Sequence, residues 1–160
     1  MPYNRLNAVE YAHKWAFGRN PRYYDFSKLG GDCTNFISQC IHAGGGSMNY
    51  TPVTGWYYIS LNNRTPSWSG VEFLYRFLVN NRGKGPYAKV VNINEIEIGD
   101  VIQLSNDGNR YFHSLLVVDI RGVKTPENIL IATHTDDSDY RPLSTYNAQY
   151  KRYLHIVGTR

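Results

Sequence analysis

Cysteine and long apolar runs are both scarce in this chain, and each shortage excludes a class of protein. Only 2 of the 160 residues are cysteine, too few for the disulfide framework of a small secreted scaffold. The longest aliphatic runs, Leu115–Val118 and Ile129–Ala132, have the length of a strand, whereas a helix that crosses a bilayer needs about 20 apolar residues. We therefore expect neither a disulfide-stapled fold nor a membrane span.

An excess of charge of one sign is also absent. Lysine and arginine number 17 against 13 aspartate and glutamate residues, a formal net charge of +4, and the basic residues are scattered. Nucleic-acid binding requires a clustered basic stripe, so we expect no nucleic-acid partner. The first residues lack the apolar core of a signal peptide. Two localisations stay open: the cytoplasm, or the cell wall and exterior if the sequence is a domain excised from a longer exported protein.

The composition is that of a globular protein. Hydrophobic residues make up 42% and charged residues 19%, which is outside the range of disordered chains. The length suits a single domain, here residues 1–160. Nothing in the pattern specifies an oligomer, so a monomer is the default expectation.

The hydrophobic period divides the chain into a helical first part and a strand-rich second part. Apolar residues recur with helical spacing over residues 7–17, 33–43 and 69–80. After Gly83, short segments rich in Val, Ile and Tyr are joined by short loops without helices, which favours an antiparallel sheet. Helices followed by strands predict an α+β fold. The expected strands are residues 87–93, 100–105, 111–120, 128–135 and 152–158.

Cys33 has a chemically special position, because it follows Gly30, Gly31 and Asp32 and opens the second expected helix. Asp32 suits the N-cap, which places the cysteine in the first turn. The free N–H groups and the helix dipole there favour a thiolate and lower the pKa of a thiol. The same N–H groups can hold an oxyanion. Cys33 is therefore a candidate nucleophile.

A structural role for the cysteines is the alternative. Cys33 shares a helix face with Phe36, Ile37 and Cys40, and free cysteine behaves as a small hydrophobe. Cys40 lies in the middle of that stripe and is predicted to be a core residue. A disulfide between the two is not expected, because seven residues of helix separate them by roughly 10 Å.

A cysteine nucleophile needs a histidine within hydrogen-bond reach and a third polar group that holds the ring. Of the 5 histidines, His113 and His134 are the candidates, because neighbouring strands could place their imidazoles side by side. The other three are expected elsewhere: His13 in solvent, His42 at a helix end and His155 satisfied within the last strand. A metal site that includes His113, His134 and Asp136 is disfavoured, because no HxxxH or CxxC spacing is present.

Four aromatic residues, Trp56, Tyr57, Tyr58 and Trp68, lie in a glycine- and proline-rich stretch between two expected helices. Two roles stay open for them: a cover over the core, or the walls of a substrate groove.

Four segments carry a resemblance to a known family. They are Gly31-Asp32-Cys33-Thr34-Asn35-Phe36-Ile37-Ser38-Gln39, Ser67-Trp68, His113-Ser114, and the stretch from Thr133-His134-Thr135-Asp136 to Arg141-Pro142-Leu143. Together they resemble the putative amidase domain family, which belongs with the papain-like NlpC/P60 and CHAP cysteine peptidases and amidases. The resemblance implies a papain-like, NlpC/P60-type fold in which a helix with the nucleophile packs on a small antiparallel sheet with the histidine.

The resemblance also implies roles for single residues. Cys33 is the nucleophile, His113 the general base and His134 the third, orienting residue of a catalytic triad, with Asp136 as the alternative for the third role. The residues expected to bind the oxyanion or the substrate are Asp32, Tyr23, Tyr24, Trp56, Trp68 and Asp136.

The implied reaction is hydrolysis of an amide bond through a thioester, without a metal or cofactor. The expected substrates are peptides of the bacterial cell wall, such as peptidoglycan-like amides. Two other classes stay open: a non-catalytic module that binds glycan or peptide on the same fold, and a cysteine acyltransferase that passes the acyl group to an amine or alcohol.

Overall fold

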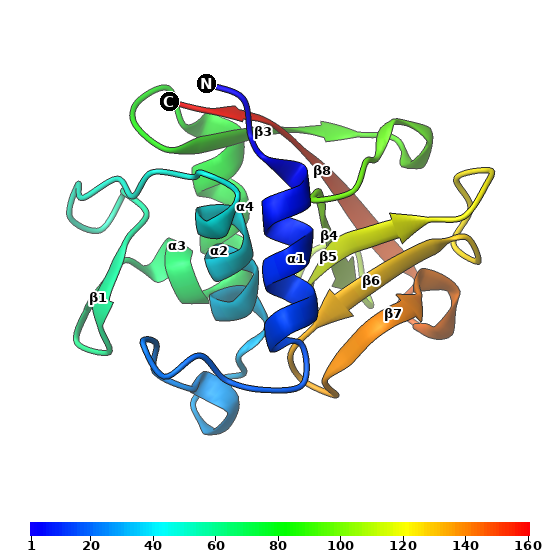
Figure 1. Ribbon diagram of the computed structural model, residues 1–160, viewed down its shortest axis with the longest axis horizontal. Coiled ribbons are helices and arrows are strands. Elements are labelled where there is room, and N and C mark those ends of the chain that lie inside the picture. Colours follow the sequence, from blue (N-terminus) through cyan, green and yellow to red (C-terminus); the bar gives the residue numbers. More distant parts are fainter.

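A six-stranded antiparallel sheet packs against a group of helices (Figure 1). The structure is a computed structural model and describes residues 1–160. The helices are α1 (Arg5–Trp15), α2 (Cys33–Ala43), α3 (Pro66–Ser69) and α4 (Val71–Asn80), with 3-10 turns η1 (Phe26–Lys28), η2 (Ile93–Glu95) and η3 (Leu143–Thr145). The strands are β1 (Tyr58–Ser60), β2 (Asn63–Arg64), β3 (Pro86–Val91), β4 (Val101–Ser105), β5 (Tyr111–Ile120), β6 (Ile129–Thr133), β7 (Ser138–Pro142) and β8 (Tyr150–Thr159). None of the helices has the length and apolar character needed to cross a membrane.

The large sheet has the strand order β3-β8-β4-β5-β6-β7, and β1 and β2 form a separate hairpin. Along β5, Leu116 and Val118 belong to the core cluster that includes the helices, whereas Leu115 and Val117 belong to a second cluster on the opposite face. Because side chains alternate between the two faces of a strand, the position of each β5 residue decides which cluster it joins.

Helix α2 is the most enclosed helix of the molecule, with residues 33–41 all buried. Its buried polar side chains have partners. Ser38 Oγ donates to the carbonyl of Trp68 at 2.8 Å, and Gln39 Oε1 accepts from the hydroxyl of Tyr11. Buried polar groups without partners are destabilising, so these contacts let a helix with polar residues on several sides lie between α1, the sheet and the segment before α3.

Helix α1 is tied to the sheet by two ionic clusters. Asp100 is fully buried and accepts hydrogen bonds from Arg5 Nη1 at 2.7 Å and from His155 Nδ1 at 2.9 Å. His155 is thus satisfied within the sheet, as expected. His13 was expected in solvent, but its Nδ1 lies 2.7 Å from Asp139 on β7, because α1 packs close to that end of the sheet.

The mixed α+β architecture and the antiparallel sheet are confirmed, and the predicted helix 33–43 and strand 111–120 have those bounds. The helix expected over 69–80 is α4, which begins at Val71 because Gly70 has an extended backbone with φ −115° and ψ 132°; the short helix α3 before it was not predicted. Strand β7 was not predicted, since the sequence Ser-Asp-Tyr-Arg-Pro has no apolar alternation and lies at the sheet edge.

Candidate active site

A pocket of about 320 Å³ opens where the start of α2, the start of β5 and the β6–β7 turn meet. Cys33 and His113 both line it, and only 6% and 7% of their surfaces are exposed. The structure thus brings together the residues expected as nucleophile and base. The other residues that line the pocket are Gly30, Gly31, Phe112, Thr135, Asp136, Arg141 and Tyr146.

Cys33 is the first residue of α2, and its thiol interacts with the backbone N–H groups of Ser114 and Thr34. Burial raises the pKa of the Cys33 thiol, and the hydrogen bonds from these N–H groups offset that effect only in part. The sequence predicted a lowered thiol pKa. The expectation was wrong because desolvation penalises the charged form more than the helix start stabilises it. At neutral pH the resting side chain is a thiol.

A buried chain of polar contacts fixes the start of α2 to β5. Thr34 Oγ1 and Ser114 Oγ lie 3.0 Å apart, and Gln103 Nε2 donates to Ser114 Oγ at 3.2 Å. Arg152 Nε in turn donates to Gln103 Oε1 at 3.1 Å. Since Ser114 directly follows His113 in the chain, these contacts fix the helix of the nucleophile relative to the strand of the base.

His113 lies near the start of β5 on the face of Leu115, opposite the helices, and reaches the pocket at the end of the sheet. Neither ring nitrogen has a hydrogen-bond partner in the protein. The pKa of His113 is lowered to about 4, chiefly by burial and secondly by the positive charge of Arg141, whereas Asp136 acts in the opposite direction. At neutral pH the imidazole is therefore uncharged and has a nitrogen that can accept a proton, as a general base requires.

His134 makes its contacts on the other side of the sheet. Its Nε2 lies 2.8 Å from the backbone oxygen of Trp15, its Nδ1 lies against the carboxylate of Asp32, and its ring stacks on Phe36. A carbonyl oxygen only accepts, so Nε2 carries a hydrogen. Both nitrogens are therefore occupied, and neither contacts His113.

The strand pairing explains why the two histidines do not meet. Leu116 lies opposite Ala132, so His134, two residues further along, lies opposite Ser114. Successive residues alternate between the faces of a sheet. His134 therefore joins the helix side, and His113 joins the opposite side. The sequence predicted imidazoles side by side, and the register places them on different faces.

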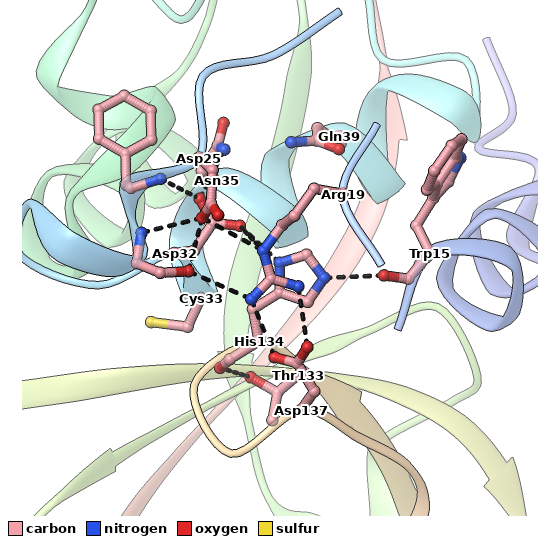
Figure 2. A network of polar contacts seen from close by, with 12 residues as sticks. Trp15, Arg19, Asp25, Asp32, Cys33, Asn35, Gln39, Thr133, His134 and Asp137 are labelled. Atoms are coloured by element: carbon pink, nitrogen blue, oxygen red, sulfur yellow. Dashed lines mark hydrogen bonds and ion pairs between the residues drawn. The ribbon is translucent and has the colours of Figure 1, made fainter. Parts of the chain in front are cut away.

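Asp32 is the centre of a buried network at the start of α2 (Figure 2). Its carboxylate oxygens contact the N–H of Phe26 at 2.8 Å, Asn35 Nδ2 at 2.9 Å, His134 Nδ1 at 2.5 Å and Arg19 Nε at 3.7 Å. Asp32 occupies the N-cap position, but its side chain makes no capping hydrogen bond, because these partners occupy it. None of the dashed contacts in Figure 2 reaches the sulfur of Cys33. Asp32 thus holds the helix start and does not face the pocket.

Four aromatic residues expected at the oxyanion or substrate lie outside the pocket. Trp56 and Trp68 are fully buried, with ring centroids 4.7 Å apart, so they cover the core and do not form a groove wall. Tyr23 packs on Trp68. Tyr24 is partly exposed, but it does not line the pocket.

The turn between β6 and β7 and the segment after it supply the remaining wall of the pocket. Thr135 and Asp136 have positive φ values of 72° and 50°. The Arg141 guanidinium stacks on the Tyr146 ring at 3.7 Å, and that ring lies 5.8 Å from the ring of His113. The sequence singled out Asp136 but assigned no role to Arg141 or Tyr146, because β7 itself was not predicted.

A second cleft, of about 500 Å³, lies between the loop of residues 49–54 and α4. No cysteine, histidine or acidic side chain lines it, so the hydroxyl groups in its wall have no general base beside them that could activate a nucleophile. No group of three or more His, Cys, Asp or Glu side chains in the structure could hold a metal ion. The smaller pocket is therefore the candidate active site.

An α+β fold with a cysteine and an uncharged histidine in one pocket is compatible with an amidase-like protein. The chain belongs to the putative amidase domain family, which matches residues 2–157. It is 38% identical over 165 residues to the uncharacterized protein YhbB of Bacillus subtilis (strain 168). That alignment covers 97% of this chain and 50% of the relative, so the chain spans about half the length of the curated relative it matches. No solved structure matches the chain.

Proposed function

We propose that this chain is a cysteine-dependent amide hydrolase in which Cys33 attacks the substrate and His113 is the general base. The observation that carries the proposal is that these two side chains, which lie far apart in the sequence, line one pocket. Membership of an amidase family supports the reaction type.

The resting protonation states define how the reaction starts. Burial raises the pKa of the Cys33 thiol and lowers that of His113 to about 4, so a neutral thiol faces a neutral imidazole at pH 7. We infer that His113 removes the proton as the sulfur attacks the carbonyl carbon, without a preformed ion pair. We infer that the backbone N–H of Cys33 donates to the oxyanion, because the first N–H groups of a helix have no partner within it.

The second half of the reaction returns both groups to their starting state. The C–N bond breaks, the leaving amine takes the proton from the His113 imidazolium, and the acyl group remains on sulfur as a thioester. Water then attacks the thioester with His113 again as the base, and the carboxylic acid product leaves with the thiol restored. No step requires a metal or cofactor.

For the third, orienting role we propose Asp136 in place of His134. Asp136 lines the pocket, and its charge favours the imidazolium form of His113. His134 contacts Asp32 and Trp15, so we assign it to positioning of the helix that bears Cys33.

The arrangement of the helices and the sheet also supports two further parts of the proposal. Residues 1–160 form a single domain, and this domain is related to the papain-like NlpC/P60 and CHAP enzymes. A helix with the nucleophile packs on an antiparallel sheet with the histidine, as that fold implies. We propose peptides of the bacterial cell wall as substrates, by analogy with those enzymes. The cell wall would be the corresponding site of action if the chain is part of an exported protein.

The test compares the two cysteines. Amine release from soluble cell-wall stem peptides should fall by about 10³-fold or more in Cys33→Ala and stay near wild type in Cys40→Ala, which removes a buried sulfur of the same helix. Added hydroxylamine should divert the acyl product to a hydroxamate, because it captures a thioester. Full activity in Cys33→Ala would overturn the proposal. Acyl transfer without hydrolysis would identify an acyltransferase, and an inert wild-type thiol would favour a non-catalytic binding module.

A further inference from the structure

Arg141 is the one permanently positive side chain among the residues that line the Cys33 pocket. It lies on β7 and is partly buried. Arg141 belongs to one of the segments that carry the family resemblance, but no role was expected for it. The proposed reaction does not use it either, because the nucleophile, the base and the oxyanion donor are supplied by α2 and β5. A fixed cation beside a reacting carbonyl group requires an explanation of its own.

The position of the Arg141 guanidinium is held by its neighbours. Its Nε donates to Thr145 Oγ1 at 2.6 Å, and its Nη2 donates to the backbone oxygen of Thr145 at 3.3 Å. The group also lies 3.7 Å from the centroid of the Tyr146 ring. Stacking and two hydrogen bonds remove much of the freedom that an arginine side chain has in solvent, so this cation is preorganised.

The same guanidinium has no anionic partner within the protein. Arg19 is paired with Asp137, and Arg152 is paired with Glu72, but no carboxylate oxygen lies within ion-pair distance of Arg141. Of the five N–H donors of a guanidinium, its contacts with Thr145 use two, and Nη1 donates to no protein group. Donors therefore remain on the planar edge that binds carboxylates in a two-point geometry.

We propose that Arg141 forms a carboxylate-binding subsite next to Cys33, and that the preferred substrates carry a carboxylate close to the scissile amide. This inference rests on the proposed function, since it names a substrate class for that reaction. The Tyr146 ring contacts the Arg141 guanidinium at 3.7 Å and lies 5.8 Å from the ring of His113, so the proposed subsite and the base share one neighbour.

Substrate binding at this subsite has a consequence for the base. Arg141 is the second cause of the lowered pKa of His113, after burial. A carboxylate on Arg141 offsets its positive field, so the imidazole becomes a stronger base when the preferred substrate is present. Asp136 lies in the same pocket but outside ion-pair distance of Arg141, and it repels a second carboxylate from the His113 side.

The first test uses two alkylating reagents of nearly the same shape. Iodoacetate transfers a carboxymethyl group and iodoacetamide a carbamidomethyl group to the Cys33 sulfur, each with loss of iodide, and the thiol proton passes to the base. Only iodoacetate carries a carboxylate. Peptide mass spectrometry gives the rate at Cys33, and the fully buried Cys40 serves as an internal reference. The ratio of the two rates cancels any change in the reactivity of the thiol itself.

We expect the ratio of iodoacetate to iodoacetamide rates to fall about fivefold or more in Arg141→Gln, because a charge-assisted hydrogen bond is lost at a partly exposed site. Arg141→Lys should retain part of the ratio. Arg82→Gln is the matched control, since it removes an exposed positive charge from the wall of the other cleft. An unchanged ratio in Arg141→Gln, or an equal fall in Arg82→Gln, would overturn the subsite.

The second test does not depend on a reactive thiol. N-acetylglycine and its amide are titrated into Cys33→Ser while the NMR signal of the Arg141 Nε–H group is followed. The acid should shift this signal and the amide should not, and the Arg141→Gln background should abolish saturable shifts elsewhere in the pocket. Equal shifts with both compounds would reject the subsite. An unreactive Cys33 together with selective binding of the acid would instead reject the hydrolase and keep the subsite.

Discussion

Asp32 and Cys33 are consecutive residues, yet they belong to two regions of opposite character. On the Asp32 side, the buried carboxylate is surrounded by partners: a backbone N–H, an amide, a histidine and an arginine (Figure 2). On the Cys33 side, His113 has no hydrogen-bond partner and Arg141 has no counterion. The comparison shows that one region is satisfied internally and holds the backbone, whereas the other leaves bonding capacity for a ligand.

The largest expected effect is a loss of activity on mutation in the Cys33 pocket. Replacing His113 by Ala removes the base, so amide hydrolysis should fall by about 10³-fold or more, while the fold remains intact because no hydrogen bond of His113 is lost. Steady-state kinetics and thermal unfolding on the same sample would check both parts. Loss of activity together with loss of the cooperative unfolding transition would contradict the division between the two regions.

Mutations in the network around Asp32 should lower the stability of the fold. Asp32→Ala leaves His134, an amide and a backbone N–H buried without their acceptor, so the free energy of unfolding should fall by about 3–5 kcal/mol. Asp25→Ala is the control, because Asp25 also pairs with Arg19 but is half exposed. It caps the short turn η1, so its loss should change stability by about 1 kcal/mol. Urea denaturation measures the free energy of unfolding of both variants, and equal losses would show that the buried network around Asp32 contributes no more than a surface ion pair.

The pH dependence separates the regions further. The pKa of His113 is about 4 in the folded chain against an ordinary 6.5, so between these values the unfolded state binds more protons. Stability therefore falls as the pH decreases from 6.5 towards 4, by up to about 3 kcal/mol from this residue. His113→Gln should remove that component. Urea midpoints measured across this range provide the check, and parallel curves for both proteins would refute the assignment.

The smallest effect is expected where the regions are joined. Ser114→Ala removes the Oγ contact with Thr34 but leaves Gln103 its second acceptor, the carbonyl of Val71 at 3.1 Å. The expected loss is about 1 kcal/mol in stability and several-fold in activity, because the start of α2 becomes less tightly fixed to β5. Kinetics with a matched Ser69→Ala control, at a half-buried position of α3 outside the pocket, would show whether the activity loss is specific.

Local pattern predicts the elements that carry the chemistry. The apolar period and the flanking glycines indicate α2 with its bounds, and a segment rich in Val and Leu after a turn indicates β5. The residues alone single out Cys33 and leave His113 and His134 as candidate bases, and the family resemblance selects His113. The predicted pKa of the thiol was wrong, because burial by other segments is a tertiary effect that a helix-start argument does not contain.

The register of the paired strands was the second property that could not be predicted from the sequence. A shift of one position exchanges the two faces of a strand, so the relation of His113 to His134 depended on a pairing that no local pattern specifies. A tryptophan in this stretch could line a groove or cover the core, and the sequence does not distinguish the two roles for Trp56 and Trp68. The packing of both residues against α2 shows that they belong to the core. Arg141 lies on an edge strand without apolar alternation, so neither the strand nor its contribution to the pocket was visible.

The two left-handed residues of the β6–β7 turn bear on how this sequence would respond to redesign. Backbone with positive φ is unfavourable for most side chains, less so for asparagine and aspartate, and carries no steric cost for glycine, and short hairpin turns of this kind favour Asn-Gly. A procedure that selects for thermal stability alone should therefore replace Asp136 by Gly, and the variant should melt at a higher temperature. The same replacement removes the carboxylate proposed to orient His113. This turn is thus a position where selection for stability and selection for turnover would drive the sequence in opposite directions.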